Sequence, residues 1–208
     1  MVYQQNIINS EIDKLEILKF KGKINVIDNR EKLKKIIPEI SNSKILGFDT
    51  ETKPNFKKGF QNRNFISLIQ FSTYEKAYLF RINKIGLPKV LISILSNPKI
   101  LKVGIGIKDD INGLSKIYQK FNGTSENGSF IPKGFFDLQN VVSDFGIEAL
   151  SLKKLGAIVL DYKISKSMQL SNWESSVLTK KQQQYAAIDA LVCLQIYCKL
   201  YDNKYRKR

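Results

Sequence analysis

Residues 45–51 read Ile-Leu-Gly-Phe-Asp-Thr-Glu, an apolar run that leads directly into two acids separated by one residue. A short apolar run of this kind is typical of a buried β-strand. Because side chains alternate between the two faces of a strand, Asp49 and Glu51 are expected to point to the same side. Carboxylates that share a partly desolvated space repel each other, and a divalent cation neutralises them. The alternative is a strand end at which two acids simply meet solvent.

The patterns on either side of this strand predict an α/β protein. Residues 24–27 are expected to form a strand and residues 31–40 a helix, which with 45–48 gives the order β-α-β. Further strands are predicted at 65–71, 76–81 and 100–107, and further helices at 90–95, 110–118, 135–145, 151–159 and 179–201. We therefore expect a mixed β-sheet flanked by helices, with a helical C-terminal half.

The length of 208 residues, 43% of them hydrophobic, suits one substantial core and is short for two. We predict a single domain over residues 1–208, with its core at about 20–200 and a short basic tail at 203–208. No apolar stretch is long enough for a signal peptide or a membrane span, so a cytoplasmic protein is expected.

The net charge of +15 favours a polyanionic partner such as nucleic acid. Composition alone leaves an equal alternative, a lysine-rich surface that only keeps the protein soluble. The absence of histidine is more decisive, because it excludes Ser-His-Asp and Cys-His catalysis, histidine metal ligands and a histidine base. Cys193 and Cys198 lack the spacing of a zinc or redox motif, and we interpret them as core thiols.

The last predicted helix carries a carboxylate on an apolar face. Asp189 shares this face with Tyr185, one turn earlier, and with Val192 and Cys193. We therefore expect Asp189 to be half-buried and the Tyr185 hydroxyl to face the same site. The alternative is an acid at a helix edge beside a packing tyrosine. Residues 179–182, Thr-Lys-Lys-Gln, fit a capping box that fixes where this helix begins.

Residues 102–110 read Lys-Val-Gly-Ile-Gly-Ile-Lys-Asp-Asp, a strand with glycines that allow close backbone approach, followed by acids at a helix start. Either acid can be an ordinary capping or first-turn residue. Because the second acid begins the predicted helix, we assign Asp109 to capping and Asp110 to the site.

Three motifs, FDTET at 48–52, GIGIKDD at 104–110 and QQYAAIDA at 183–190, occur in the order of the three exonuclease motifs of the DEDD superfamily. The chain resembles the tyrosine type of this superfamily, in particular the Werner-type exonuclease domains and more distantly the ribonuclease D family. The resemblance spans about residues 20–200. It includes KGFFDLQNV at 133–141, SLKKL at 151–155 and ISKSMQLSNWE at 164–174.

This resemblance implies a ribonuclease-H-like fold and a metal-dependent 3′-to-5′ exonuclease that releases nucleoside 5′-monophosphates. It implies two Mg²⁺ or Mn²⁺ ions held by Asp49 and Glu51 of the first motif, Asp110 of the second and Asp189 of the third. Tyr185 is the third motif's tyrosine, at a place where the other subclass has a histidine. DNA is the favoured substrate, and a 3′-to-5′ exoribonuclease in RNA processing is the alternative.

Four basic residues follow the first motif and are expected to hold the backbone of an entering strand: Lys53, Lys57, Lys58 and Arg63. Phe56 and Phe60 lie among them and are candidates for stacking on bases. A charged loop with aromatic side chains tucked into the core fits equally well. Trp173 belongs to a family motif, but we interpret it as a core residue.

Two other functional classes fit the sequence less well. A nucleic-acid-binding module without catalysis would keep the basic segment, but it would need neither the four acids nor the tyrosine. A protein that binds a phosphate metabolite would require a complete glycine-rich loop before a helix, and residues 104–106 are incomplete for that purpose.

Overall fold

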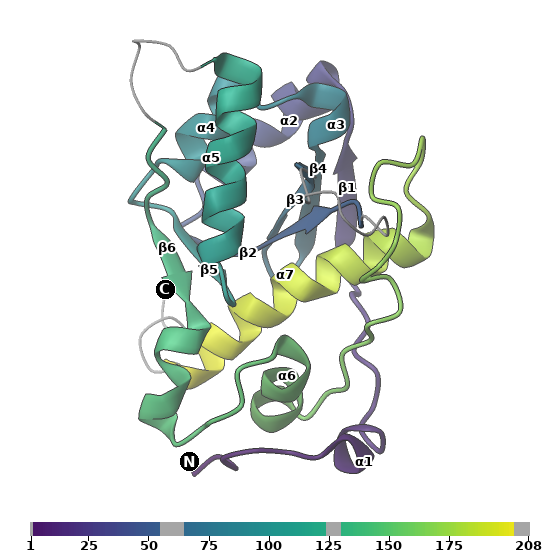
Figure 1. Ribbon diagram of the computed structural model, residues 1–208, viewed down its shortest axis with the longest axis vertical. Helices are drawn as coiled ribbons and strands as arrows, with labels where there is room; N and C mark the ends of the chain where they lie inside the picture. Colours follow the sequence, from purple (N-terminus) through teal and green to yellow (C-terminus); the bar gives the residue numbers. More distant parts are fainter. Residues whose placement is uncertain (1, 55–64, 124–129, 202–208) are drawn as a thin grey trace, which may run out of the picture.

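Six strands form one mixed sheet in the order β1-β4-β3-β2-β5-β6 in the computed structural model, which describes residues 2–54, 65–123 and 130–201 (Figure 1). The strands are β1 (Lys23–Ile27), β2 (Ile45–Thr52), β3 (Ile66–Ser72), β4 (Lys76–Arg81), β5 (Leu101–Gly104) and β6 (Phe135–Asp137). Strand β2 runs antiparallel to β3 and parallel to β5. The strand that carries the first two acids therefore lies inside the sheet.

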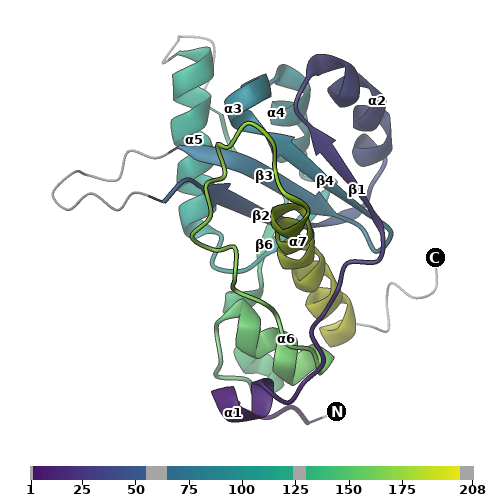
Figure 2. The same ribbon diagram turned by 90° about the vertical axis from the view of Figure 1, so that its right-hand side faces the viewer.

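Helices cover both faces of this sheet (Figure 2). They are α1 (Asn9–Ile12), α2 (Arg30–Ser41), α3 (Ile82–Ile85), α4 (Lys89–Leu95), α5 (Lys108–Asn122), α6 (Leu152–Leu160) and α7 (Lys180–Leu200), with 3₁₀ turns at Leu138–Asn140 and Val142–Phe145. On one face, α2, α4 and α5 bury Leu46 and Phe48 of β2. On the other, α7 crosses the sheet and α6 packs behind it, around Val103 and Leu191. Alternate side chains of each strand thus enter two different cores.

The α/β prediction is confirmed, including the mixed sheet and the helical C-terminal half. The helix predicted at 135–145 is wrong, because residues 135–137 pair with β5 as strand β6 and only two 3₁₀ turns follow. The strand predicted at 100–107 ends at Gly104, and α5 begins at Lys108. In the described part of the chain, no helix is long and apolar enough to cross a membrane.

Candidate active site

The side chains of β2 point alternately toward α7 and toward α5. Asp49 and Glu51 point to the same side of the strand, as the sequence predicted, and this side faces α7 and includes Gly47. A Cβ atom added to Gly47 would lie 1.8 Å from the carbonyl oxygen of Ala190. Only glycine therefore lets the α7 backbone approach β2 this closely, and this contact brings Asp189 to the two acids of the strand.

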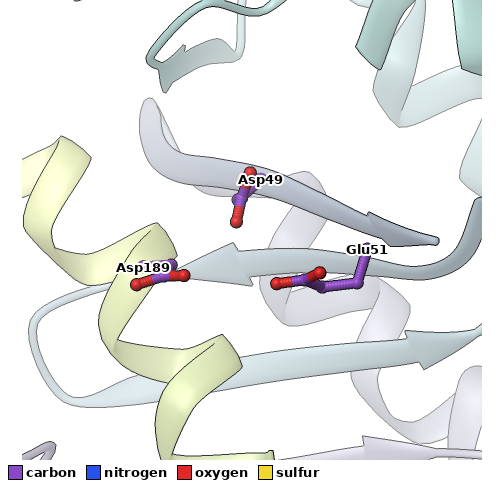
Figure 3. Close-up of side chains that lie close together, drawn as sticks. All are labelled: Asp49, Glu51 and Asp189. Carbon is purple, nitrogen blue, oxygen red and sulfur yellow. The ribbon is translucent and has the colours of Figure 1, made fainter. Parts of the chain in front are cut away.

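The carboxyl groups of Asp49, Glu51 and Asp189 converge on one space (Figure 3). One oxygen of each residue lies within 4.8 Å of the others. Asp189 is 6% exposed, more deeply buried than the sequence suggested. Three acids from two distant segments thus meet where water is scarce, and none of them has a cationic partner in an ion pair among the described residues.

Burial and mutual repulsion raise the pKa of these acids. Burial, followed by the charges of Asp189 and Glu51, raises the pKa of Asp49 well above its ordinary value. Burial and the charges of Asp189 and Asp110 raise the pKa of Glu51 to about 9. Burial raises the pKa of Asp189 to about 7, although a hydrogen bond from the Tyr185 hydroxyl lowers it. The cluster is therefore costly to ionise on its own.

Asp110 reaches the site from the opposite face of β2. Thr50 points toward α5, and its hydroxyl donates a hydrogen bond to the Asp110 carboxylate. Asp110 lies outside the group of three oxygens, but its charge still raises the pKa of Glu51. Burial raises the pKa of Asp110 itself to about 6, against the hydrogen bond from Thr50. The structure thus brings all four predicted acids to the C-terminal half of β2, three together and the fourth alongside.

Asp109 does not cap the helix, contrary to the sequence prediction. The N-cap of α5 is Ile107, whose side chain makes no capping hydrogen bond, so both acids lie in the first turn. Asp109 is exposed, whereas Asp110 is partly buried and faces Thr50. Asp110 is therefore the acid beside the site because it is partly buried and faces Thr50, and not because Asp109 caps the helix.

Asp137 positions this turn, and sequence reasoning did not single it out. Its carboxylate accepts hydrogen bonds from the backbone amides of Gly106, at 2.9 Å, and Ile107, at 3.0 Å. Gly106 has a φ of +61°, which glycine adopts without strain. Asp137 thereby holds the sharp turn from β5 into the helix that carries Asp110. The available signal was its place in the KGFFDLQNV motif.

Tyr185 is fixed by the loop that precedes α7. Its ring lies 5.9 Å, centroid to centroid, from the ring of Trp173, which is fully buried as predicted. The buried Arg81 guanidinium donates to the backbone carbonyls of Ser175 and Ser176, which ties this loop to β4. Burial and the nearby carboxylates raise the pKa of Tyr185 strongly, so its hydroxyl remains protonated at neutral pH.

The start of α7 is set by the predicted capping box. The Thr179 hydroxyl accepts from the Gln182 amide at 3.2 Å, and the Gln182 side chain accepts from the Thr179 amide at 2.9 Å. The Gln182 side-chain amide also donates to the Asn172 carbonyl at 3.1 Å. The capping box therefore fixes where the helix begins, and Gln182 also holds the loop that contains Trp173 against the helix start.

A cavity of about 290 Å³ opens over the acids. Besides Asp49, Glu51, Asp189 and Tyr185, it is lined by residues of α6 and of the loop after it, among them Lys153, Lys166 and Gln169. The Lys166 charge lowers the pKa of Asp189. Sequence reasoning missed these lining residues, although Lys166 and Gln169 belong to the ISKSMQLSNWE motif.

The donor set fits a hard divalent cation such as Mg²⁺ or Mn²⁺. These ions prefer carboxylate oxygens, and the cluster offers three of them within 4.8 Å of one another. The raised pKa values of Glu51 and Asp189 indicate a cluster that lacks positive charge. The acids therefore form a site that could bind metal.

Comparison with known proteins agrees with this geometry. The family model described as 3′-5′ exonuclease matches residues 24–203. The chain belongs to the 3′-5′ exonuclease family. This match confirms the resemblance inferred from the three motifs. It also confirms the prediction that the chain is an enzyme of the 3′-5′ exonuclease type.

This 3′-5′ exonuclease chain spans only 13% and 26% of the length of two curated relatives that it matches, the mouse WRN protein and the Aedes aegypti exonuclease mut-7 homolog. The mouse bifunctional 3′-5′ exonuclease/ATP-dependent helicase WRN is 33% identical over 198 residues, which cover 90% of this chain and 13% of that protein. The EXO domain of Aedes aegypti Nibbler superposes with a TM-score of 0.73 at 23% identity, over 89% of this chain and 91% of that one. Escherichia coli RNase D gives 0.71 at 20% identity, over 86% and 44%. The two structures support the fold.

Lys53 is exposed and lies 3.5 Å from the Glu174 carboxylate. The other predicted strand-holding residues, Lys57, Lys58 and Arg63, lie outside the described residues, as do Phe56, Phe60 and the tail at 203–208. Their role in binding stays a prediction. Both cysteines are free; Cys193 is buried in the core as predicted and Cys198 is half-buried.

Proposed function

We propose that this chain hydrolyses nucleic acid from its 3′ end, releases nucleoside 5′-monophosphates, and uses two divalent cations held by Asp49, Glu51, Asp110 and Asp189. The single observation that carries the proposal is the convergence of three carboxyl oxygens within 4.8 Å from segments about 140 residues apart in a family of 3′-5′ exonucleases. The acids are mutually repulsive, so the folded site favours a bound cation over its own ionised state.

Bound divalent cations supply a polarised phosphoryl group, an activated water and a stabilised leaving oxygen. The residues of the chain position these parts. Tyr185 keeps its proton, so its hydroxyl orients the attacking water by hydrogen bonding and does not act as its base. Lys166, on the wall of the cavity, can offset charge on the phosphate. Attack of water on phosphorus with departure of the 3′ oxygen leaves a nucleoside 5′-monophosphate.

DNA is the favoured substrate because the mouse exonuclease/helicase WRN is 33% identical over 90% of this chain, and the DNA polymerase I of Aquifex aeolicus is 28% identical over 85% of it. RNA is the second candidate, because the fold of the chain is also that of RNase D. Parallel assays on DNA and RNA separate the two substrates.

The test is incubation with 5′-labelled single strands of DNA and RNA in Mg²⁺ or Mn²⁺. We expect a ladder of products shortened by one nucleotide at a time, faster on DNA. Asp49→Ala and Asp110→Ala should abolish the ladder, whereas Asp109→Ala, a change of the exposed neighbour, should preserve it. Binding of intact strands without shortening would overturn hydrolysis in favour of a binding module, and a ladder from Asp49→Ala would remove Asp49 from the mechanism.

A further inference from the structure

A second hollow lies next to the acidic cavity. It is a groove of about 740 Å³ between the extended segment before β1, the loop after α6 and the first turns of α7. Ser165 and Tyr185 line both the groove and the acidic cavity. A chain bound in the groove can therefore continue past Tyr185 to the acids.

The groove combines an apolar floor with a basic rim. Its floor includes Leu18, Phe20, Met168 and Ile188, and its rim carries four exposed lysines: Lys19, Lys21, Lys180 and Lys181. Within residues 2–54, 65–123 and 130–201, no carboxylate oxygen lies within 4.0 Å of the ammonium groups of these lysines. The rim is thus a source of positive charge without an acidic partner in the described chain.

Two of these lysines lie where they do not stabilise the fold. Lys180 and Lys181 are the first two residues of α7, and the first turn contains no acid. The positive end of a helix dipole disfavours cations in this turn. An anion bound beside this turn would reverse the penalty, since it meets both the lysines and the helix end.

The walls of the groove are held in place by backbone contacts. The Gln184 side chain accepts from the Phe20 amide and donates to the Phe20 carbonyl, both at 3.2 Å. The Leu18 amide donates to the Lys163 carbonyl at 3.0 Å, and the Lys163 amide donates to the Glu16 carbonyl at 2.9 Å. The segment before β1, which runs beside α7 in Figure 2, is therefore fixed to both other walls. Because the walls are already fixed before a ligand binds, little conformational entropy of the protein is lost on binding.

We propose that this groove holds the unpaired nucleotides that precede the 3′-terminal one, with their bases on the apolar floor and their phosphates on the four lysines. The inference rests on the proposed function, because the groove leads to the acidic cavity. Apolar surfaces that accept base faces, beside cations that follow the backbone, are the usual means of holding single strands without sequence preference. Charge complementarity favours this occupant over a protein segment.

The test compares two variants of equal charge change. The groove variant replaces Lys19, Lys21, Lys180 and Lys181 by alanine, and the control variant replaces Lys34, Lys35, Lys89 and Lys99, which are exposed on or just after α2 and α4 on the other face of the sheet. Binding of a fluorescent oligothymidylate of about twelve nucleotides is measured against salt in the Asp49→Ala background. We expect affinity to fall about tenfold and the salt slope to flatten by up to about 3 in the groove variant, since each phosphate contact on a single strand contributes about 0.7.

A small substrate separates the groove from the acidic cavity. The p-nitrophenyl ester of thymidine 5′-monophosphate has no preceding nucleotide that could occupy the groove. The groove variant should therefore hydrolyse it with unchanged kcat/KM, while its KM for the oligonucleotide rises. Equal oligonucleotide binding in the groove and control variants would overturn the inference, and so would a parallel loss on the small ester. Failure of the unaltered protein to cleave the ester would count against the proposed hydrolysis, whereas the binding comparison would still decide the groove.

Discussion

The two faces of β2 hold acids in different ways. On the α7 face, Asp49, Glu51 and Asp189 gather with no cationic partner in an ion pair among the described residues. Burial, followed by the charges of Asp189 and Asp110, raises the pKa of Glu51 to about 9. On the α5 face, the Asp110 carboxylate has a partner, the Thr50 hydroxyl, and its pKa rises only to about 6. On the α7 face a bound cation would neutralise the clustered acids, whereas on the α5 face the Thr50 hydroxyl already donates to Asp110 and lowers its pKa.

The largest effect is expected from Asp189→Asn on the α7 face. Removal of one ligand charge should lower the rate of hydrolysis about a thousandfold or more, because a bound metal lowers the activation barrier by several kcal/mol. The metal-free protein should be no less stable than the wild type, since the change removes repulsion. Rates on labelled strands and thermal unfolding measure the two effects. If Asp189→Asn kept activity within tenfold of the wild type, the acids of the α7 face would matter no more for hydrolysis than the α5 face does.

The next largest effect is expected from Gly47→Ala. The added methyl group would lie 1.8 Å from the Ala190 carbonyl oxygen, so α7 must move away from β2. We expect a loss of about 1–3 kcal/mol in the free energy of unfolding and about a hundredfold in kcat, since small misplacements of reacting groups cost that much.

Gly146→Ala is the matched control for this change. Gly146 has a φ of +75° and no atom near an added Cβ, and it lies outside the residues that line the cavity. This variant should lose stability through backbone strain and keep its activity. If both glycine variants lose activity in proportion to their stability, the close approach of α7 has no special role.

A smaller effect is expected on the α5 face, from Thr50→Val. Loss of the hydroxyl donor should reduce kcat/KM about tenfold, the worth of one hydrogen bond to a charged group. Thr52→Val, an exposed change on the same strand, serves as the control. A loss as large as that of Asp189→Asn would show that Asp110 depends on its partner as strongly as the α7 face depends on metal.

The smallest effect is a pH-dependent gain in Tm on addition of Mn²⁺. The folded pKa values of Glu51, about 9, and Asp189, about 7, exceed their ordinary values. In the metal-free protein, the protonated forms of these two groups therefore contribute to the free energy of unfolding at low pH. This contribution is lost as the pH rises through the folded pKa values, about 7 for Asp189 and about 9 for Glu51. Because Mn²⁺ binds the ionised form, the gain in Tm should be larger at about pH 8 than at about pH 5. Asp189→Asn should reduce this difference, and an equal gain at both values would contradict it.

The sequence predicted the sheet well where side-chain alternation and helical spacing were regular. Residues 76–81 form the predicted strand, and the Thr179 and Gln182 capping box is present. Residues 135–145 were predicted wrongly because their apolar spacing fits a helix, whereas pairing with β5 decides their structure. Tertiary pairing of this kind leaves no local pattern in the sequence.

The four acids and Tyr185 were found from strand alternation, helix spacing and the resemblance. The residues that position them were not, because their role depends on distant partners. Gly47 matters only because Ala190 lies against it, and Asp137 matters only because it faces the Gly106 turn. The single-domain and cytoplasmic predictions remain predictions.

The link between Phe20 and Gln184 bears on where this protein can be shortened. The family match begins at residue 24, but Phe20 is 4% exposed, and Ile7 and Ile12 pack against Ala157 of α6. An expression boundary placed at the first strand would strip these apolar contacts from the fold and expose the helix surfaces beneath them. Truncated versions should therefore retain the leading residues, even though the family model begins at residue 24.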